Sequence, residues 1–484
     1  MTAPMNGGTD AFVLDDDRFF DPDPVVREIA RYLYNSVRDL PLICPHGHVD
    51  PAILSSNEPF PDPVALLITP DHYILRMLYS QGVPLESLGI EATDAREVES
   101  DPKRIWQRFA DCYYLFRGTP TKAWLDYQLA EVFQVTRPLD GSTAGQVYGE
   151  ICERLSSPEF RPRALFDLFN IEVLATTDKA ADPLDHHQAI RKSEWGGRVI
   201  PTFRPDSLFA ISAAGWMDEL EALSAAADVA VTDAKSFLEA IAVRRSFFRS
   251  MGATATDHGV DSAYTERLAS PDLEVVFERA LDKSATVADQ VRFEAHMLME
   301  MAEMSLHDGL VMQIHPGVLR NHNSGFSERF GPDKGCDIPV VHEYTRNLRP
   351  LLTEYGNNAD FTLVLFTLDE STYSRELAPL AGHYPAVRLG PPWWFNDSIE
   401  GMRRFREHTT ETAGIYNTAG FNDDTRAFCS IPARHDLSRR MDSNFLARLV
   451  ATHVIPKADA LEMAHSLAYG LAKSTYKLDA GAKA

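Results

Sequence analysis

The first regular pattern of apolar and polar positions lies near the start of the chain. Four apolar residues recur every fourth position and would share one face of a helix: Val25, Ile29, Leu33 and Val37. Asp23 can cap that helix, and Pro24 suits its first turn. The pattern predicts a helix over 24–37. The apolar run at 40–45 is too short for a helix and predicts a buried strand.

The segment 57–165 shows helical spacing and no alternation typical of strands. Thr69-Pro70-Asp71 predicts a helix start, with Thr69 as the cap and Pro70 in the first turn, and that helix runs to about Gly82. Further helices are predicted over about 103–116, 121–134 and 144–155. We interpret the segment as a helical insertion with its own packed core.

Beyond residue 165 the pattern changes to short apolar runs that end in polar residues or glycine. The predicted strands lie at 171–178, 198–206, 252–259, 310–317, 361–366, 386–390 and 414–424. Helical stretches such as 234–251 and 285–307 separate them. With the run at 40–45, eight strands alternate with helical or loop segments, which indicates parallel pairing with right-handed crossovers.

This alternation predicts an α/β fold of the (β/α)8, TIM-like barrel type, with an active site at the carboxyl ends of the strands. An open doubly wound sheet is the alternative. No G-x-G-x-x-G follows an early strand, so dinucleotide binding has no support. The predicted organisation is 1–56 for the first helix and strand, 57–165 for the insertion, and 166–484 for the rest of the barrel.

Composition narrows the class of protein further. The 484 residues carry 47 Lys+Arg and 70 Asp+Glu, and the formal net charge of −23 opposes binding to nucleic acid or to an anionic membrane. The five cysteines are scattered without a C-x-x-C pair, which fits a reducing compartment. Residues 1–8 lack the pattern of a signal peptide, and no apolar stretch is long enough to span a bilayer. A cytoplasmic protein is expected.

Candidate metal ligands stand at the predicted strand ends. His46 and His48 follow the first strand at i, i+2 spacing and can aim two imidazoles at one point. His315 closes the fifth strand and Asp424 closes the eighth. In a closed barrel these ends converge, and three imidazoles with one carboxylate suit Zn2+ or a similar divalent ion.

Other polar residues fall at the same predicted edge. Arg426 repeats the i, i+2 spacing after Asp424, so both side chains can enter the barrel mouth. His72 and Tyr73 lie at a predicted helix N-terminus, where backbone amides favour anions. Arg204 ends the third strand.

Two further sequence stretches lie near these ends. Trp393 and Trp394 follow the seventh strand, where their rings can stack on the apolar face of a sugar-like ligand. Asp257-His258 ends the fourth strand, and a structural role there is as plausible as a direct one.

Eight stretches then carry a resemblance to a known family. They are Cys44-Pro-His-Gly-His48, Asp71-His-Tyr-Ile-Leu-Arg76, Thr176-Thr-Asp178, Phe203-Arg-Pro-Asp206, Ala255-Thr-Asp-His-Gly259, Gln313-Ile-His-Pro-Gly-Val-Leu-Arg-Asn-His-Asn323, Trp393-Trp-Phe-Asn-Asp397 and Asp424-Thr-Arg426. In this order, from about 20 to 475, the chain resembles the uronate isomerase (glucuronate isomerase) family, a divergent branch of the amidohydrolase superfamily. The Trp-Trp-Phe-Asn-Asp and His-Tyr-Ile blocks are specific to the family, whereas His-x-His marks only the superfamily.

The resemblance implies a distorted (β/α)8 barrel with an early helical insertion and a homo-oligomeric assembly. It implies a zinc ion held by His46, His48 and Asp424, with His315 either a further ligand or a substrate contact. Two stretches depart from the family pattern. Thr367-Leu-Asp-Glu-Ser371 stands where Asn-Pro-Arg-Asp is frequent, and Asn-Asp-Asp-Thr-Arg stands where Thr-Asp-Ser-Arg is usual.

The implied activity is aldose–ketose isomerisation of D-glucuronate to D-fructuronate and of D-galacturonate to D-tagaturonate. A proton would move from C2 to C1 through an enediol, with Asp424 as the base and with Arg426 and Tyr73 holding the enediolate. The predicted substrate-binding residues are His72, Arg204, Trp393, Trp394 and Arg320. Among them Arg204 is preferred for the C6 carboxylate because of its bidentate fit.

Two other functions compete with isomerisation. A metal-dependent hydrolase would use the same ligands to activate water, with Asp424 as the base. Such enzymes often add a second metal through a Lys or Glu of the fourth strand, and here that strand offers Asp257-His258 and no obvious lysine. A non-catalytic sugar-acid-binding protein is the second rival, and convergent catalytic groups argue against it.

Overall fold

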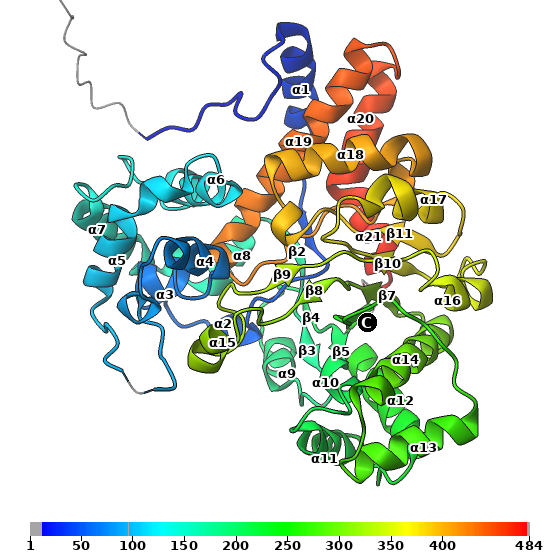
Figure 1. Cartoon of the computed structure of the whole chain (residues 1–484). Helices are drawn as coiled ribbons and strands as arrows, with labels where there is room; N and C mark the ends of the chain where they lie inside the picture. Colours follow the sequence, from blue (N-terminus) through cyan, green and yellow to red (C-terminus); the bar gives the residue numbers. More distant parts are fainter. Residues whose placement is uncertain (1–11, 95, 482–484) are drawn as a thin grey trace, which may run out of the picture.

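Short parallel strands, wrapped by helices, form the centre of the computed structural model, which describes residues 12–94 and 96–481 (Figure 1). The stretch 1–8, predicted not to be a signal peptide, lies outside these residues. No helix in the described part of the chain has the length and apolar character needed to cross a membrane.

Two sheets contain parallel strands only. Strands β1 (Leu42–Cys44), β2 (Ile171–Ala175) and β4 (Val199–Ile200) pair in the order β1-β2-β4. The second sheet has the order β11-β10-β7-β6-β5-β3, and its strands are β3 (Asp178–Lys179), β5 (Phe203–Arg204), β6 (Ala255–His258), β7 (Val311–Ile314), β10 (Leu363–Leu365) and β11 (Val387–Leu389). An antiparallel pair, β8 (Val318–Leu319) and β9 (Ile338–Pro339), lies apart from them.

Backbone hydrogen bonds join the two parallel sheets into one arc. Strand β2 runs into β3 and β4 runs into β5, and the amides of Thr176 and Asp178 donate to the carbonyls of Ile200 and Thr202, each at 3.0 Å. The arc therefore follows the predicted order of the first seven strands. The carboxyl ends of these parallel strands face one edge, where an active site is expected.

The eighth predicted strand, 414–424, does not form. A 3-10 helix occupies Ile415–Asn417, and a single parallel bridge joins Thr418 to Leu389. Gly420 and Asp424 have φ angles of 77° and 39°, which are incompatible with an extended strand. The His48 amide donates to the Thr425 carbonyl at 3.1 Å, but no ladder closes the arc within the described residues. The fold is thus mixed α/β with parallel sheets, and strand pairing does not confirm a closed barrel.

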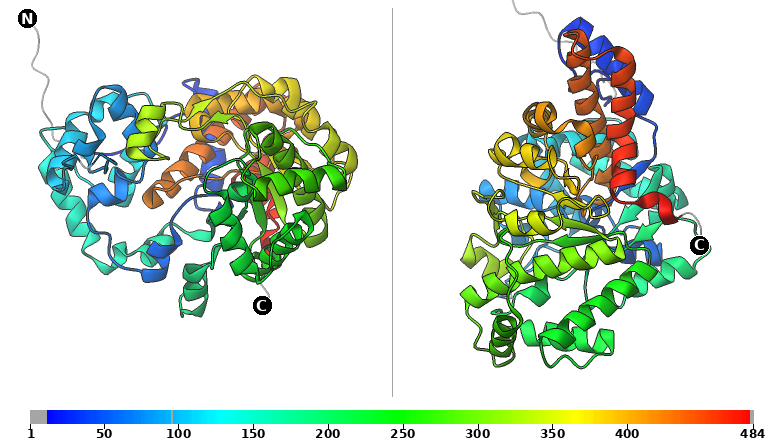
Figure 2. Two further views of the ribbon diagram at one scale, coloured as in Figure 1. Left: turned by 60° about the horizontal axis from the view of Figure 1, so that its bottom comes forward. Right: turned by 90° about the vertical axis from the view of Figure 1, so that its right-hand side faces the viewer.

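The predicted helix 24–37 is present as α1 (Pro24–Val37). The Asp23 carboxylate accepts hydrogen bonds from the amides of Val25 and Val26, which caps the helix as expected. Helix α1 packs against α19 (Ile431–Ala451) and α20 (Lys457–His465). Figures 1 and 2 show these three helices together at one end of the molecule.

The segment 57–165 is helical, and it gathers on one side of the strands (Figure 1). Its α-helices are α3 (Pro63–Leu67), α4 (His72–Ser80), α5 (Pro102–Asp111), α6 (Pro120–Tyr127) and α7 (Ala144–Leu155), and α8 (Pro162–Leu168) crosses its end. The predicted cap of α4 was wrong: Asp71, not Thr69, accepts from the Tyr73 amide at 2.9 Å. Pro70 consequently precedes the helix. The division into domains stays a prediction.

The remaining helices connect or cover the strands. They are α2 (Pro51–Ser56), α9 (Asp185–Lys192), α10 (Asp206–Phe209), α11 (Trp216–Ala227), α12 (Ala234–Ser250), α13 (Ser270–Leu281), α14 (Val287–Asp308), α15 (Ser324–Phe330), α16 (Arg349–Glu354), α17 (Ala378–Ala381), α18 (Ile399–Ala413) and α21 (Leu471–Thr475). Helices α12 and α14 match the predicted 234–251 and 285–307. Both begin with capping boxes, Asp233 with Ser236 and Thr286 with Asp289.

Candidate active site

A cavity of about 560 Å³ opens at the edge where the parallel strands end. Every site residue predicted from the sequence except His46 lines it: His48, His72, Tyr73, Arg204, His315, Arg320, Trp393, Trp394, Asp424 and Arg426. His46 lies directly beneath, with 0% of its surface exposed. Residues far apart in the sequence therefore converge on one hollow.

Three of the predicted metal ligands form a compact group. Asp424 Oδ1 lies 3.5 Å from His46 Nε2 and 3.2 Å from His48 Nε2. One ligand atom from each residue falls within 4.8 Å of the other two. Both His46 ring nitrogens and Asp424 Oδ1 are buried without a hydrogen-bond partner in the described structure. Unpartnered nitrogen and oxygen ligands at these separations fit a first-row divalent ion such as Zn2+.

Contacts within this group shift the pKa values of its members. Burial acts to lower the pKa of His46, but Asp257 and Asp424 outweigh it and raise that pKa. Burial acts to raise the pKa of Asp424, but the contacts with His46 and His48 outweigh it and hold the pKa well below its usual range. Burial lowers the pKa of His48, so its imidazole is neutral near pH 7. Asp424 also has a φ of 39°, an unusual backbone geometry that functional residues often adopt.

His315 pairs with Asp257, which lies outside the group of His46, His48 and Asp424. Its Nε2 lies 2.9 Å from Asp257 Oδ1, while the other carboxylate oxygen lies 3.3 Å from Arg204 Nη1. Asp257 is 0% exposed, and His46 Nδ1 approaches it at 3.8 Å. Burial acts to raise the pKa of Asp257, but the contacts with His315, His46 and Arg204 hold the pKa of this carboxyl well below its ordinary value. Asp257 thus lies beneath the site and contacts His46, Arg204 and His315. The role of His315 as a metal ligand stays a prediction.

Gly259 makes this close packing possible. A Cβ atom at this position would lie 2.5 Å from Arg204 Nη2, 2.6 Å from His315 Cε1 and 2.9 Å from Asp206 Oδ2. No side chain larger than hydrogen fits without displacing the groups that face the cavity.

We therefore expect Gly259→Ala to lower kcat/KM by about 10²-fold, the scale of an ångström-sized misplacement of site groups. Steady-state kinetics measures the effect. The matched control is Gly149→Ala in α7, where an added Cβ meets nothing within 4 Å. That variant should keep full activity and gain about 0.5–1 kcal/mol of stability. Equal activity of the two variants would contradict the packing argument.

Arg426, His72 and Tyr73 form the side of the cavity nearest the helical insertion. Arg426 Nη2 lies 3.1 Å from Asp333 Oδ2. The His72 and Tyr73 rings stack with centroids 4.4 Å apart. Burial, assisted by the positive charge of Arg426, lowers the pKa of His72 to about 3, so this imidazole is neutral. Burial raises the pKa of Tyr73, so its hydroxyl keeps its proton and can donate it.

The predicted substrate-binding arginines have acidic partners. Arg204 Nε donates to Asp206 Oδ2 at 2.7 Å in addition to its contact with Asp257. Arg320 Nη1 lies 2.9 Å from Asp337 Oδ2, and its guanidinium lies over the Trp394 ring at 5.0 Å. These pairs fix both side chains along the cavity.

The two tryptophans differ in their settings. Trp393 is 4% exposed and packs edge-on against His315, with centroids 4.9 Å apart. Trp394 is only half-buried and lines the same cavity. Trp393 therefore acts as a wall behind the site, and Trp394 offers the accessible ring.

Sequence reasoning missed Arg434, which lies within α19. Arg434 is 1% exposed, and its Nη1 donates to Asp397 Oδ2 at 2.7 Å. Its guanidinium covers the Trp124 ring at 3.8 Å and lies 5.2 Å from the Tyr73 ring. No local sequence signal distinguishes Arg434 from the other arginines of this polar helix.

The fold and site together define a class: an α/β protein with a metal-ligand group and acid–base side chains at the carboxyl edge of parallel strands. Comparison with known proteins specifies the family. The glucuronate isomerase family model matches residues 18–476, and the chain belongs to that family.

Relatives support this assignment over nearly the whole chain. Uronate isomerases of Nostoc punctiforme and Sphingopyxis alaskensis are 52% and 53% identical, each covering 96% of this chain and 99% of the relative. The crystal structure of glucuronate isomerase from Caulobacter crescentus is similar with a TM-score of 0.95 at 51% identity, covering 97% of this chain and 98% of the other. Uronate isomerase from Thermotoga maritima gives 0.89 at 27% identity, with 96% and 99% covered.

Proposed function

We propose that this enzyme isomerises D-glucuronate to D-fructuronate, and D-galacturonate to D-tagaturonate. Family membership supports the reaction class. The structural observation that carries the proposal is the ionised Asp424 carboxylate, held by His46 and His48 and open to a cavity lined with cationic and aromatic groups. The alternative of a metal-dependent hydrolase is not favoured by the family assignment.

In the proposed reaction Asp424 removes the proton at C2 of the open-chain aldose and returns it to C1. Asp424 is ionised at neutral pH, so it can accept a proton, and it lies beside two imidazoles. His46, His48 and Asp424 would hold the divalent ion, with His315 the further candidate ligand. When bound, such an ion polarises substrate oxygens as a Lewis acid.

The enediolate needs positive charge and a proton donor beside it. Arg426 supplies the charge, and its pairing with Asp333 fixes the direction of the guanidinium. Tyr73 keeps its hydroxyl proton and lines the same cavity, so it can donate to a substrate oxygen. Both residues are proposed to stabilise the oxyanion, and Tyr73 is proposed to relay the proton between oxygens.

The C6 carboxylate requires a cation at the other end of the cavity. Arg204 remains the proposed partner, although Asp206 and Asp257 already share its charge. Arg76 is an additional candidate, because its guanidinium lies over the Phe395 ring at 4.8 Å and lines the cavity. No carboxylate of the described residues forms an ion pair with Arg76, and burial lowers the pKa of its guanidinium. His72, being neutral, would contribute a hydrogen bond and not a charge.

Several further expectations belong to this proposal. The arc of strands and the His48–Thr425 backbone hydrogen bond are consistent with a distorted (β/α)8 barrel whose last position lacks a ladder. We also propose a zinc-loaded homo-oligomer in the cytoplasm. The net charge of −23 supports the view that it binds neither nucleic acid nor membrane.

The test is ketose formation from glucuronate and from galacturonate, followed by NMR. We expect fructuronate and tagaturonate respectively, with no reaction on D-glucose, which lacks the C6 carboxylate. Lactone and amide substrates serve as the comparison for hydrolase activity. Hydrolysis without ketose formation would overturn the proposal.

A further inference from the structure

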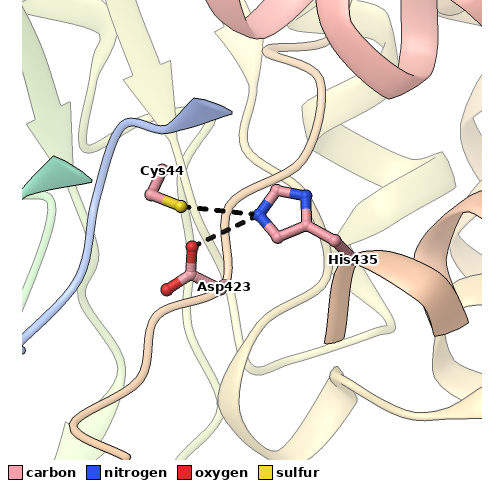
Figure 3. Close-up of side chains that lie close together, drawn as sticks. All are labelled: Cys44, Asp423 and His435. Carbon is pink, nitrogen blue, oxygen red and sulfur yellow. Dashed lines mark hydrogen bonds and ion pairs between the residues drawn. The ribbon is translucent and has the colours of Figure 1, made fainter. Parts of the chain in front are cut away.

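A second group of potential metal ligands lies outside the cavity described above. Cys44 ends β1, Asp423 precedes Asp424, and His435 belongs to α19. Their side chains point toward one another from three different segments (Figure 3). All three are buried, with exposed fractions of 0%, 0% and 3%. One ligand atom from each lies within 4.8 Å of the other two.

We propose that Cys44, Asp423 and His435 form a second metal site, which binds Zn2+ or a similar first-row divalent ion. Thiolate, imidazole and carboxylate are the ligand types that zinc takes in proteins. The site is structural in character, because neither Cys44, Asp423 nor His435 lines the active-site cavity. No residue is shared with the group of His46, His48 and Asp424.

The distances within this group lie in hydrogen-bond range and are also compatible with a shared ion. His435 Nε2 lies 3.7 Å from Cys44 Sγ and 3.4 Å from Asp423 Oδ2. A tetrahedral zinc ion with usual bond lengths places sulfur and nitrogen about 3.5 Å apart and nitrogen and oxygen about 3.3 Å apart. A charge-assisted N–H···O hydrogen bond would be about 2.7–2.9 Å long. Both observed separations are therefore close to the edges of a coordination tetrahedron.

The carboxylate of this group has, among the described residues, an unsatisfied acceptor atom. Asp423 Oδ1 is buried and has no hydrogen-bond partner in the described part of the chain. Arg439 is the nearby cation on α19, but its Nη atoms donate to the backbone carbonyls of Arg38 and Pro41 at 2.8 and 2.9 Å. A divalent ion bound to one carboxylate, one thiolate and one neutral imidazole gives a group with no net charge. Coordination releases the thiol proton to solvent.

A separate cavity reaches this group from the opposite side. It has a volume of about 600 Å³ and is lined by His435, with Leu42 and Arg439 beside it. None of these three residues lines the active-site cavity. His435 therefore borders a cavity that is distinct from the substrate site.

An ion bound to Cys44, Asp423 and His435 would stabilise the fold by linking separate segments. β1 and the segment around Asp423 are the first and last positions of the arc of strands, and no ladder joins them in the described structure. An ion held by Cys44, Asp423 and His435 would link these two segments to α19. Because His46 follows Cys44 and Asp424 follows Asp423, the link would fix the backbone that carries the active-site ligands.

The experiment uses the full chain expressed in medium that contains Co2+ as the only supplemented divalent transition metal, so that the buried site fills during folding. We expect about two Co2+ per chain by elemental analysis and a thiolate-to-Co2+ charge-transfer band in the near-ultraviolet spectrum. The active-site group contains no sulfur, so the band cannot arise from that group. One Co2+ per chain without the band would overturn the proposal.

Two variants assign the band. Cys44→Ser should lose it and retain one Co2+, whereas Cys429→Ser, which alters another fully buried cysteine, should keep it. His48→Ala removes an active-site ligand and should also keep the band. If Cys44→Ser does not fold, the wild-type and His48→Ala spectra decide whether the band arises from the second site. Loss of the band in His48→Ala or in Cys429→Ser would contradict the assignment to Cys44.

Discussion

Asp424→Asn is expected to lower kcat/KM for glucuronate by about 10³–10⁴-fold, the upper part of the range for a general base. The amide cannot accept the C2 proton, and it loses the charge that His46 and His48 stabilise. The fold should persist, because the change is isosteric and the site lies at a strand edge. Steady-state kinetics and circular dichroism measure the two expectations.

Two companion variants separate the base from its neighbours. Asp333→Asn removes a cavity carboxylate that pairs with Arg426, and its effect should be smaller by at least tenfold. His48→Ala should reduce bound metal about as much as Asp424→Asn does. If His48→Ala and Asp424→Asn lose metal and activity equally, Asp424 acts as a ligand and not as the base. Near-normal turnover of Asp424→Asn would refute its place in the mechanism.

Arg434→Met is expected to reduce the free energy of unfolding by about 3–5 kcal/mol, the usual cost of leaving one partner of a buried ion pair uncompensated. The full loss is expected only above pH 7, because burial raises the pKa of Asp397 to about 7. The variant would leave Asp397, which is 3% exposed, without its cation. It would also remove the guanidinium that covers the Trp124 ring beside Tyr73. Urea unfolding followed by tryptophan fluorescence measures the loss.

The double variant Arg434→Met with Asp397→Asn is the control. Because it removes both charges, it should recover part of the lost stability. The loss in the double variant minus the sum of the losses in Arg434→Met and Asp397→Asn gives the coupling energy of the pair. A single variant that loses less than about 1 kcal/mol, or a double variant that loses the full sum, would show that the pair is not a buried ionic unit.

Local sequence signals predicted the elements whose causes are local. Asp23, Pro24 and the apolar spacing that follows define α1, and the structure confirms its bounds. The His-x-His pair and Asp424 converge as predicted, although Asp424 follows an irregular segment and not the predicted strand. The cap of α4 was misassigned because two capping residues, Thr69 and Asp71, lie two positions apart.

Features that depend on distant partners could not be predicted in this way. The eighth strand fails because the chain turns through positive φ at Gly420 and Asp424, and nothing in its apolar spacing indicates that turn. Helix α19 is polar in sequence yet mostly buried, because its charges pair with other segments, as Arg434 does with Asp397. Asp257 gains its importance only from contacts with Arg204 and His315.

The most direct test of the central claim, that Asp424 moves a proton between C2 and C1, is the fate of a deuterium label. The enzyme is given glucuronate deuterated at C2 in ordinary water, and the label at C1 of the ketose is measured by NMR. Because the Asp424 side chain is 11% exposed at the cavity wall, part of the label should exchange with solvent, and the C1 deuterium content should fall below that of the substrate. Quantitative transfer of the label to C1 would contradict the expected exchange with solvent and favour a hydride shift over transfer by Asp424.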